Sequence, residues 1–121
     1  MRRLSPMLLA LAFPLAACGN SGATPVATGG NAHRGAKLIA SIGCGSCHSI
    51  PGIADAVGKV GPPLDNIGAR TIIAGKLPNT PENMIAWVES PQSIVPGNAM
   101  PNMGLTEAQA RDVAAYLYTL R

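Results

Sequence analysis

The chain contains the segment Cys44-Gly45-Ser46-Cys47-His48, which brings two thiols and an imidazole together within five residues. Two cysteines that are separated by two residues can add their thiols across the two vinyl groups of a haem. The histidine that follows them then lies under the iron as its proximal ligand. The segment therefore predicts one covalently attached haem c, bound by Cys44 and Cys47, with His48 coordinating the iron.

Three other interpretations of this motif compete with haem attachment. A structural zinc site needs four ligands, and the chain has no second cysteine pair. A thioredoxin-like redox pair needs a βαβ context, which the sequence pattern does not indicate. A disulfide between the two cysteines leaves His48 without a role. An export signal at the N-terminus favours haem, because haem is attached covalently outside the bacterial cytoplasm.

The N-terminus has the pattern of such an export signal. Arg2 and Arg3 precede an uncharged apolar run, residues 4–17, which is shorter than the ~20 residues that a membrane-spanning helix takes. Pro6 and Pro14 argue against a buried core helix. We therefore expect residues 1–17 to be a signal peptide, so that the mature protein lies on the periplasmic side of the cell envelope.

The end of this run, Leu15-Ala16-Ala17-Cys18, resembles the lipobox of bacterial lipoproteins. The resemblance implies that Cys18 is lipidated and becomes the first residue of the mature chain, which anchors the protein to a membrane. The alternative is ordinary cleavage that leaves a free thiol at Cys18. Residues 18–30 are small and rich in glycine, and we expect a lipidated N-terminus followed by a flexible tether. The folded domain is expected over residues 31–121.

The composition fits one small domain that lacks large core side chains. The chain has 121 residues, 14 Gly and 11 Pro, but only 3% aromatic and 12% charged residues. Too few charges and no heptads exclude a coiled coil, and a net charge of +3 argues against nucleic-acid binding. A haem is a large apolar body that can replace the missing aromatic volume.

The hydrophobic pattern predicts an all-α fold of three to four helices connected by long loops. One helix is expected over residues 31–42, ending at Gly43. A second begins after Thr80, with Pro81 in its first turn, and ends at Ser90. A third begins at a capping box formed by Thr106 and Gln109. Its buried stripe is expected to be Ala110, Val113, Leu117 and Leu120, and a shorter helix is expected over residues 64–69.

Residues 31–121 resemble the class I cytochromes c. Gly35 matches the family's glycine at the crossing of the N-terminal and C-terminal helices, and Gly61-Pro62-Pro63-Leu64 resembles the family's Gly-Pro-x-Leu. The resemblance implies that the Pro62 carbonyl accepts a hydrogen bond from the proximal histidine, which orients the ring. It also implies that Arg70, eight residues later, meets a haem propionate.

A second block, from Trp87 to Met100, resembles the family segment that ends in the axial methionine. It implies that Met100 is the sixth iron ligand, that Trp87 packs at the haem site, and that Asn98 occupies a propionate-contacting position. Met103 in the same loop is the alternative ligand. Met84 is expected to pack in the core, and His33 is expected to be exposed on its helix.

These features imply a one-electron carrier rather than an enzyme, because His/Met ligation leaves no open position on the iron. Residues 77–83 and 96–101 are similar to the cytochrome c domains that accompany bacterial haem-copper oxidases, so we expect a terminal oxidase as partner. A subunit that takes electrons from a periplasmic dehydrogenase is the alternative. A haem sensor or peroxidase with a labile sixth site is a third hypothesis. We expect a monomeric domain.

Overall fold

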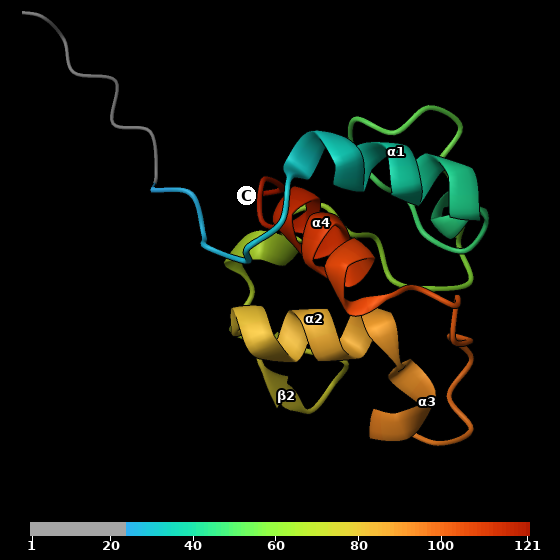
Figure 1. Ribbon diagram of the computed structural model, residues 1–121. Helices are drawn as coiled ribbons and strands as arrows, with labels where there is room; N and C mark the ends of the chain where they lie inside the picture. The colour runs from blue at the N-terminus through green and yellow to red at the C-terminus, as the bar shows by residue number, and fades with distance from the viewer. Residues whose placement is uncertain (1–23) are drawn as a thin grey trace, which may run out of the picture.

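The computed structural model describes residues 24–121; the expected signal peptide and Cys18 lie outside the described residues. Four α-helices carry the fold: α1 (Ala32–Ile42), α2 (Pro81–Glu89), α3 (Pro91–Ile94) and α4 (Glu107–Leu117). In Figure 1, α1 and α2 lie on either side of α4, and both pack against it. Long loops make up most of the rest, so the predicted all-α fold is confirmed.

The three main helices begin where the sequence pattern predicts, and α1 and α2 also end there. The side chain of Asn31 caps α1 by accepting from the backbone N–H of Arg34, and Gly43 ends the helix with a φ of 84°. Thr80 caps α2 in the same way, with Pro81 in the first turn. At the start of α4 both hydrogen bonds of the Thr106–Gln109 capping box are present.

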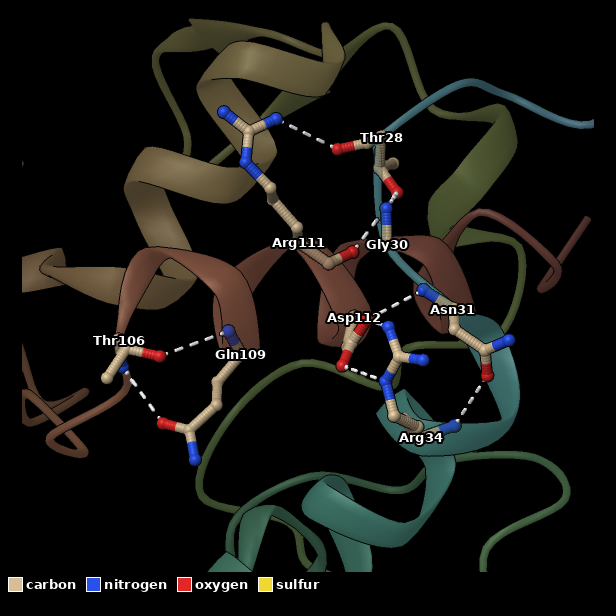
Figure 2. A network of polar contacts seen from close by, with 8 residues as sticks. All are labelled: Thr28, Gly30, Asn31, Arg34, Thr106, Gln109, Arg111 and Asp112. Carbon is tan, nitrogen blue, oxygen red and sulfur yellow. Dashed lines mark hydrogen bonds and ion pairs between the residues drawn. The ribbon is translucent and has the colours of Figure 1, made fainter.

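The crossing of α1 over α4 depends on Gly35. A Cβ at this position would collide with the backbone oxygen of Asp112, so only glycine lets the two helices approach so closely. Beside the crossing, the carboxylate of Asp112 accepts hydrogen bonds from the Asn31 backbone at 2.7 Å and from the Arg34 guanidinium at 2.8 and 2.9 Å (Figure 2). The role of Gly35 that the family resemblance implied is confirmed.

The residues just before α1 lie along α4 rather than apart from the domain. Thr28 is 4% exposed, and its hydroxyl donates to the backbone oxygen of Arg111 at 3.1 Å. The Arg111 guanidinium donates in return to the Thr28 carbonyl at 3.0 Å (Figure 2). Gly30 packs so closely on the Arg111 backbone that a Cβ would not fit. The packed part of the chain therefore includes residues before the boundary expected at residue 31, since Thr28 is buried and Val26 packs against the core.

Four parts of the fold differ from the sequence expectations. Residues 72–78 form a two-stranded antiparallel hairpin, β1 (Ile72–Ile73) and β2 (Leu77–Pro78), in which Ile73 pairs with Leu77. The short helix expected over residues 64–69 is one 3₁₀ turn, η2 (Ile67–Ala69), and the loop after residue 90 contains α3. Helix α4 ends at Leu117, so Leu120 lies beyond it, where its carbonyl accepts from the Gly68 backbone.

Within residues 24–121 no helix has both the length and the apolar character needed to cross a membrane.

Candidate functional site

A cavity of about 590 Å³ lies beside the packed helices, and its walls are mainly apolar. Helices α1, α2 and α4 form one part of its lining, and the hairpin and the loops form the rest. Every site residue that the sequence predicted in the haem domain lines this one cavity: Cys44, Cys47, His48, Pro62, Arg70, Trp87, Asn98 and Met100, together with the alternative ligand Met103.

The cysteines lie on a short 3₁₀ turn, η1 (Cys44–Ser46), that follows α1 directly. The Cys44 carbonyl accepts from the backbone N–H groups of both Cys47 and His48, at 3.2 and 3.0 Å, which fixes the compact turn of the motif. Cys44 and Cys47 are not joined in a disulfide, and both are half-buried at the cavity wall. Burial raises the pKa of the Cys44 thiol. Both cysteines therefore line the same cavity.

The His48 ring is held on two sides. Its Nδ1 lies 2.8 Å from the carbonyl oxygen of Pro62, a distance at which a protonated Nδ1 donates to that oxygen. Gly61 lies against the ring, and a Cβ there would collide with Cε1, Nδ1 and Nε2. With Nδ1 bonded to a carbonyl, the neutral ring leaves the lone pair of Nε2 free to bind a metal.

Met100 and Met103 lie in the loop between α3 and α4, and both line the cavity. The two residues differ in how their backbone is held. The backbone N–H of Met100 donates to Asn98 Oδ1 at 2.7 Å, and its carbonyl accepts from Gln92 Nε2 at 2.7 Å. Among the described residues no hydrogen bond restrains the backbone of Met103.

Arg70 and Trp87 lie on other parts of the cavity wall. The Arg70 guanidinium donates to the carbonyls of Pro63 and Asp65, at 2.6 and 3.0 Å, which fixes its position next to the loop that carries Pro62. Trp87 contributes its indole from α2, next to the fully buried Met84. His33 is exposed on α1, as expected, and does not line the cavity.

The cavity fits a haem in size and in chemistry. Its volume lies within the ~300–1,000 Å³ of ordinary cofactor sites. It offers two thiols and an imidazole from one segment, a thioether from another, and apolar walls elsewhere. Among residues 24–121 no three His, Cys, Asp or Glu side chains lie together as metal ligands, so these residues do not form the zinc site weighed above.

The model of the cytochrome c family matches residues 32–121, and the chain belongs to that family, as a class I cytochrome c domain. It therefore carries one covalently attached haem c and is a domain for haem-based electron transfer. Curated relatives named cytochrome c oxidase subunit 2 are similar to it. The protein from Alkalihalophilus pseudofirmus is 36% identical over 91 residues, which are 74% of this chain and 26% of the relative.

A second relative with the same name, from Bacillus sp., is 34% identical over 101 residues, which are 80% of this chain and 28% of the relative. A third, from Bacillus subtilis, is 33% identical over 94 residues, which are 74% of this chain and 26% of the relative. The chain thus spans about a quarter of the length of these relatives.

One residue of the site was not found from the sequence. Gln92 makes four hydrogen bonds to the loop that carries Met100. In the sequence, however, it lies in a stretch that is typical of an irregular connection. The available signal was Pro91 after the polar Ser90, which is also the pattern of a short helix start.

Proposed function

We propose that this protein is a one-electron carrier in which Cys44 and Cys47 bind the haem covalently and His48 and Met100 are its axial ligands. The observation that supports this proposal is that all of these residues, which are as much as 56 positions apart in sequence, line a single apolar cavity. When bound, the haem supplies an iron that cycles between the ferric and ferrous states.

The protein's own residues set the conditions for that cycle. The hydrogen bond between His48 and the Pro62 carbonyl holds the ring in one orientation and makes its Nε2 a stronger donor to the iron. The apolar walls exclude water, and Arg70 supplies a fixed positive charge at the cavity for a haem propionate. With two protein ligands no position is open for a substrate, so the protein itself is not an enzyme.

Met100 is favoured over Met103 because its backbone is held at both the N–H and the carbonyl. A thioether is a weak ligand, so a loop that is already ordered reduces the entropy lost when the sulfur binds. The backbone that carries the Met100 sulfur is therefore already held in place, which favours this residue as the ligand.

The hydrogen bonds of Asn98 support a role other than the propionate contact that the family resemblance implies. Both donors of its amide go to carbonyls at the two ends of α3, those of Pro91 at 3.2 Å and Val95 at 2.6 Å. We propose that Asn98 orders the loop around Met100, and that Arg70 is the main residue for a propionate.

The partner that we propose is a terminal oxidase. Support comes from the relatives named cytochrome c oxidase subunit 2, which match this chain over most of its length. We further propose that lipidated Cys18 holds the monomeric domain at a membrane on the periplasmic side. The intact mass of the membrane-extracted protein would report haem attachment and acylation together.

The axial ligands are tested by comparing Met100→Ala with Met103→Ala. We expect a low-spin ferric spectrum with a sulfur-to-iron charge-transfer band in the parent protein. The band should disappear in Met100→Ala, with carbon monoxide binding rapidly to the reduced protein, and should remain in Met103→Ala. The reverse pattern would assign the ligand to Met103. A high-spin parent protein that binds carbon monoxide rapidly would support the sensor or peroxidase hypothesis instead.

The partner is tested by mixing the reduced protein with oxidase-containing membranes and following its reoxidation by oxygen. We expect rapid reoxidation that cyanide blocks, and no reoxidation in membranes from a strain that lacks the oxidase. If the oxidase makes no difference, and a periplasmic dehydrogenase with its substrate reduces the protein, the dehydrogenase is the partner.

A further inference from the structure

The loop that carries Met100 has few means of ordering itself. Residues 96–102 form neither helix nor strand, and Pro96 and Pro101 have no backbone N–H to donate. The loop is nevertheless held by a dense set of hydrogen bonds, and most of these come from the side chains of two residues, Gln92 and Asn98.

Gln92 uses every polar atom of its side-chain amide on this loop. Its Nε2 donates to the carbonyls of Asn98 at 2.9 Å and Met100 at 2.7 Å, and its Oε1 accepts from the Gly97 backbone at 3.0 Å. The backbone N–H of Gln92 also donates to Asn102 Oδ1 at 3.1 Å. Because two of these hydrogen bonds need a donor and the third needs an acceptor, they define which amide atom is Nε2 and which is Oε1.

The residue that carries this amide is itself firmly placed. Gln92 is the second residue of α3, directly after Pro91, which is one of the largest fully buried side chains of the described residues. The far end of α3 is tied to the hairpin, because Lys76 Nζ donates to the Ile94 carbonyl at 3.2 Å. Gln92 therefore links a fixed part of the core to a loop that lacks its own secondary structure.

We propose that Gln92 is a positioning residue for the sixth iron ligand: it holds the Met100 loop closed and so decides how readily an external ligand displaces the Met100 sulfur. This inference rests on the proposed function, in which Met100 is the ligand. Gln92, which contacts the loop from α3, would then control ligand exchange at the Met100 position.

The test compares Gln92→Glu with Ser93→Ala in the haem-loaded protein. The glutamate has the same shape and keeps an acceptor for Gly97, but it has no donor for the carbonyls of Asn98 and Met100. Ser93 is the exposed neighbour in α3, and its hydroxyl bonds only to that of Ser90. The measurement is the affinity of the ferric protein for imidazole, followed by loss of the sulfur-to-iron charge-transfer band.

We expect imidazole to bind about 10- to 100-fold more tightly to Gln92→Glu, because two hydrogen bonds that favour the closed loop are lost. The imidazole affinity of Ser93→Ala should stay within about twofold of the parent value. The loss of even one hydrogen bond to the Met100 loop would change it by more than that. A second readout, amide hydrogen exchange at Met100, should be faster in Gln92→Glu and unchanged in Ser93→Ala. Gln92→Glu with parental affinity and parental exchange would overturn the inference.

The parallel variant Met100→Ala separates this inference from the proposed function. If the charge-transfer band survives in Met100→Ala, the ligand assignment fails and with it the inference. If the band is lost there but Gln92→Glu behaves like the parent protein, the assignment stands and only the role of Gln92 is wrong. Thermal unfolding, monitored by circular dichroism, verifies that each variant is folded at the temperature of the measurement.

Discussion

Gly61 shows how one missing side chain sets the geometry of the site. The His48 ring lies where the Cβ of any other residue at position 61 would be, while its Nδ1 is held by the neighbouring Pro62 carbonyl. The ring is therefore held by contact with the Gly61 backbone and by the hydrogen bond to the Pro62 carbonyl. The glycine in the Gly-Pro segment is required by this close approach and not by a left-handed backbone, which other glycines of the chain adopt.

We expect Gly61→Ala to disturb the haem spectrum as well as stability. Because the ring must turn away from the new methyl group, the Pro62 bond should be lost and the low-spin fraction reduced. The free energy of unfolding should fall by about 1–3 kcal/mol, as for overpacked sites in general. Absorption spectra and denaturant unfolding measure the two effects.

Gly104→Ala is the matched control for this variant. Its Cβ would meet open space, but its φ of 71° is unfavourable for alanine, which costs about 1–2 kcal/mol. It should therefore lose stability without any change in the spectrum. Identical spectra for the parent protein and Gly61→Ala would show that the ring has more freedom than the structure indicates.

At the scale of elements, the α1–α4 crossing holds the molecule together. Gly35 allows the close contact, and buried Asp112 bonds both to the start of α1 and to Arg34 (Figure 2). The hydrogen bond and the positive charge of Arg34 hold the pKa of Asp112 below its ordinary value. The carboxylate therefore stabilises the folded state in its charged form.

This arrangement predicts a specific dependence of stability on pH. The contribution of a carboxylate with a lowered pKa is fully present above its unfolded pKa of about 3.9 and is lost as the pH falls through the folded value. We expect Asp112→Asn to be less stable than the parent protein by about 1–3 kcal/mol at pH 7, the range for hydrogen bonds to charged groups. The difference should shrink below about pH 4.

Denaturant unfolding from pH 7 to pH 2, followed by far-ultraviolet circular dichroism, measures this difference. Other carboxylates titrate in the same range, but they titrate in both proteins and cancel in the comparison. A difference that stays constant down to pH 2 would mean that the charge of Asp112 contributes nothing to the crossing.

At the scale of the whole molecule, the segment before α1 is part of the folded domain. Thr28 and Arg111 exchange two hydrogen bonds, and Gly30 packs on the α4 backbone (Figure 2). The segment N-terminal to the domain is therefore attached at a defined place on α4. If Cys18 is lipidated, the tether between anchor and domain is shorter than residues 18–30, and the domain is held closer to the membrane.

We expect a chain that begins at Asn31 to be less stable than one that begins at Thr24, both exported with the same signal and loaded with haem. The loss should be about 1–3 kcal/mol, because two hydrogen bonds and the buried Thr28 are removed. Thermal or denaturant unfolding measures it, and Thr28→Ala in the longer chain should show part of the same loss. Equal stability of the two chains would place the domain boundary at residue 31.

The local features of this protein could be predicted because they depend on residues close together in sequence. The caps Asn31, Thr80 and Thr106 act within three residues, and the spacing of Cys44, Cys47 and His48 is dictated by the haem itself. These patterns predicted the main helices and the covalent cofactor. The resemblance to class I cytochromes c added the distant residues Pro62, Arg70 and Met100.

The features that could not be predicted depend on contacts between distant segments. Asp112 is buried because α1 and residues 28–30 cover it, and nothing in the sequence around it indicates this. The amides of Gln92 and Asn98 bind backbone groups whose positions are known only after the loop has folded. Hydrogen bonds of side chains to irregular backbone have no sequence period, so tertiary packing alone determined how Met100 is held.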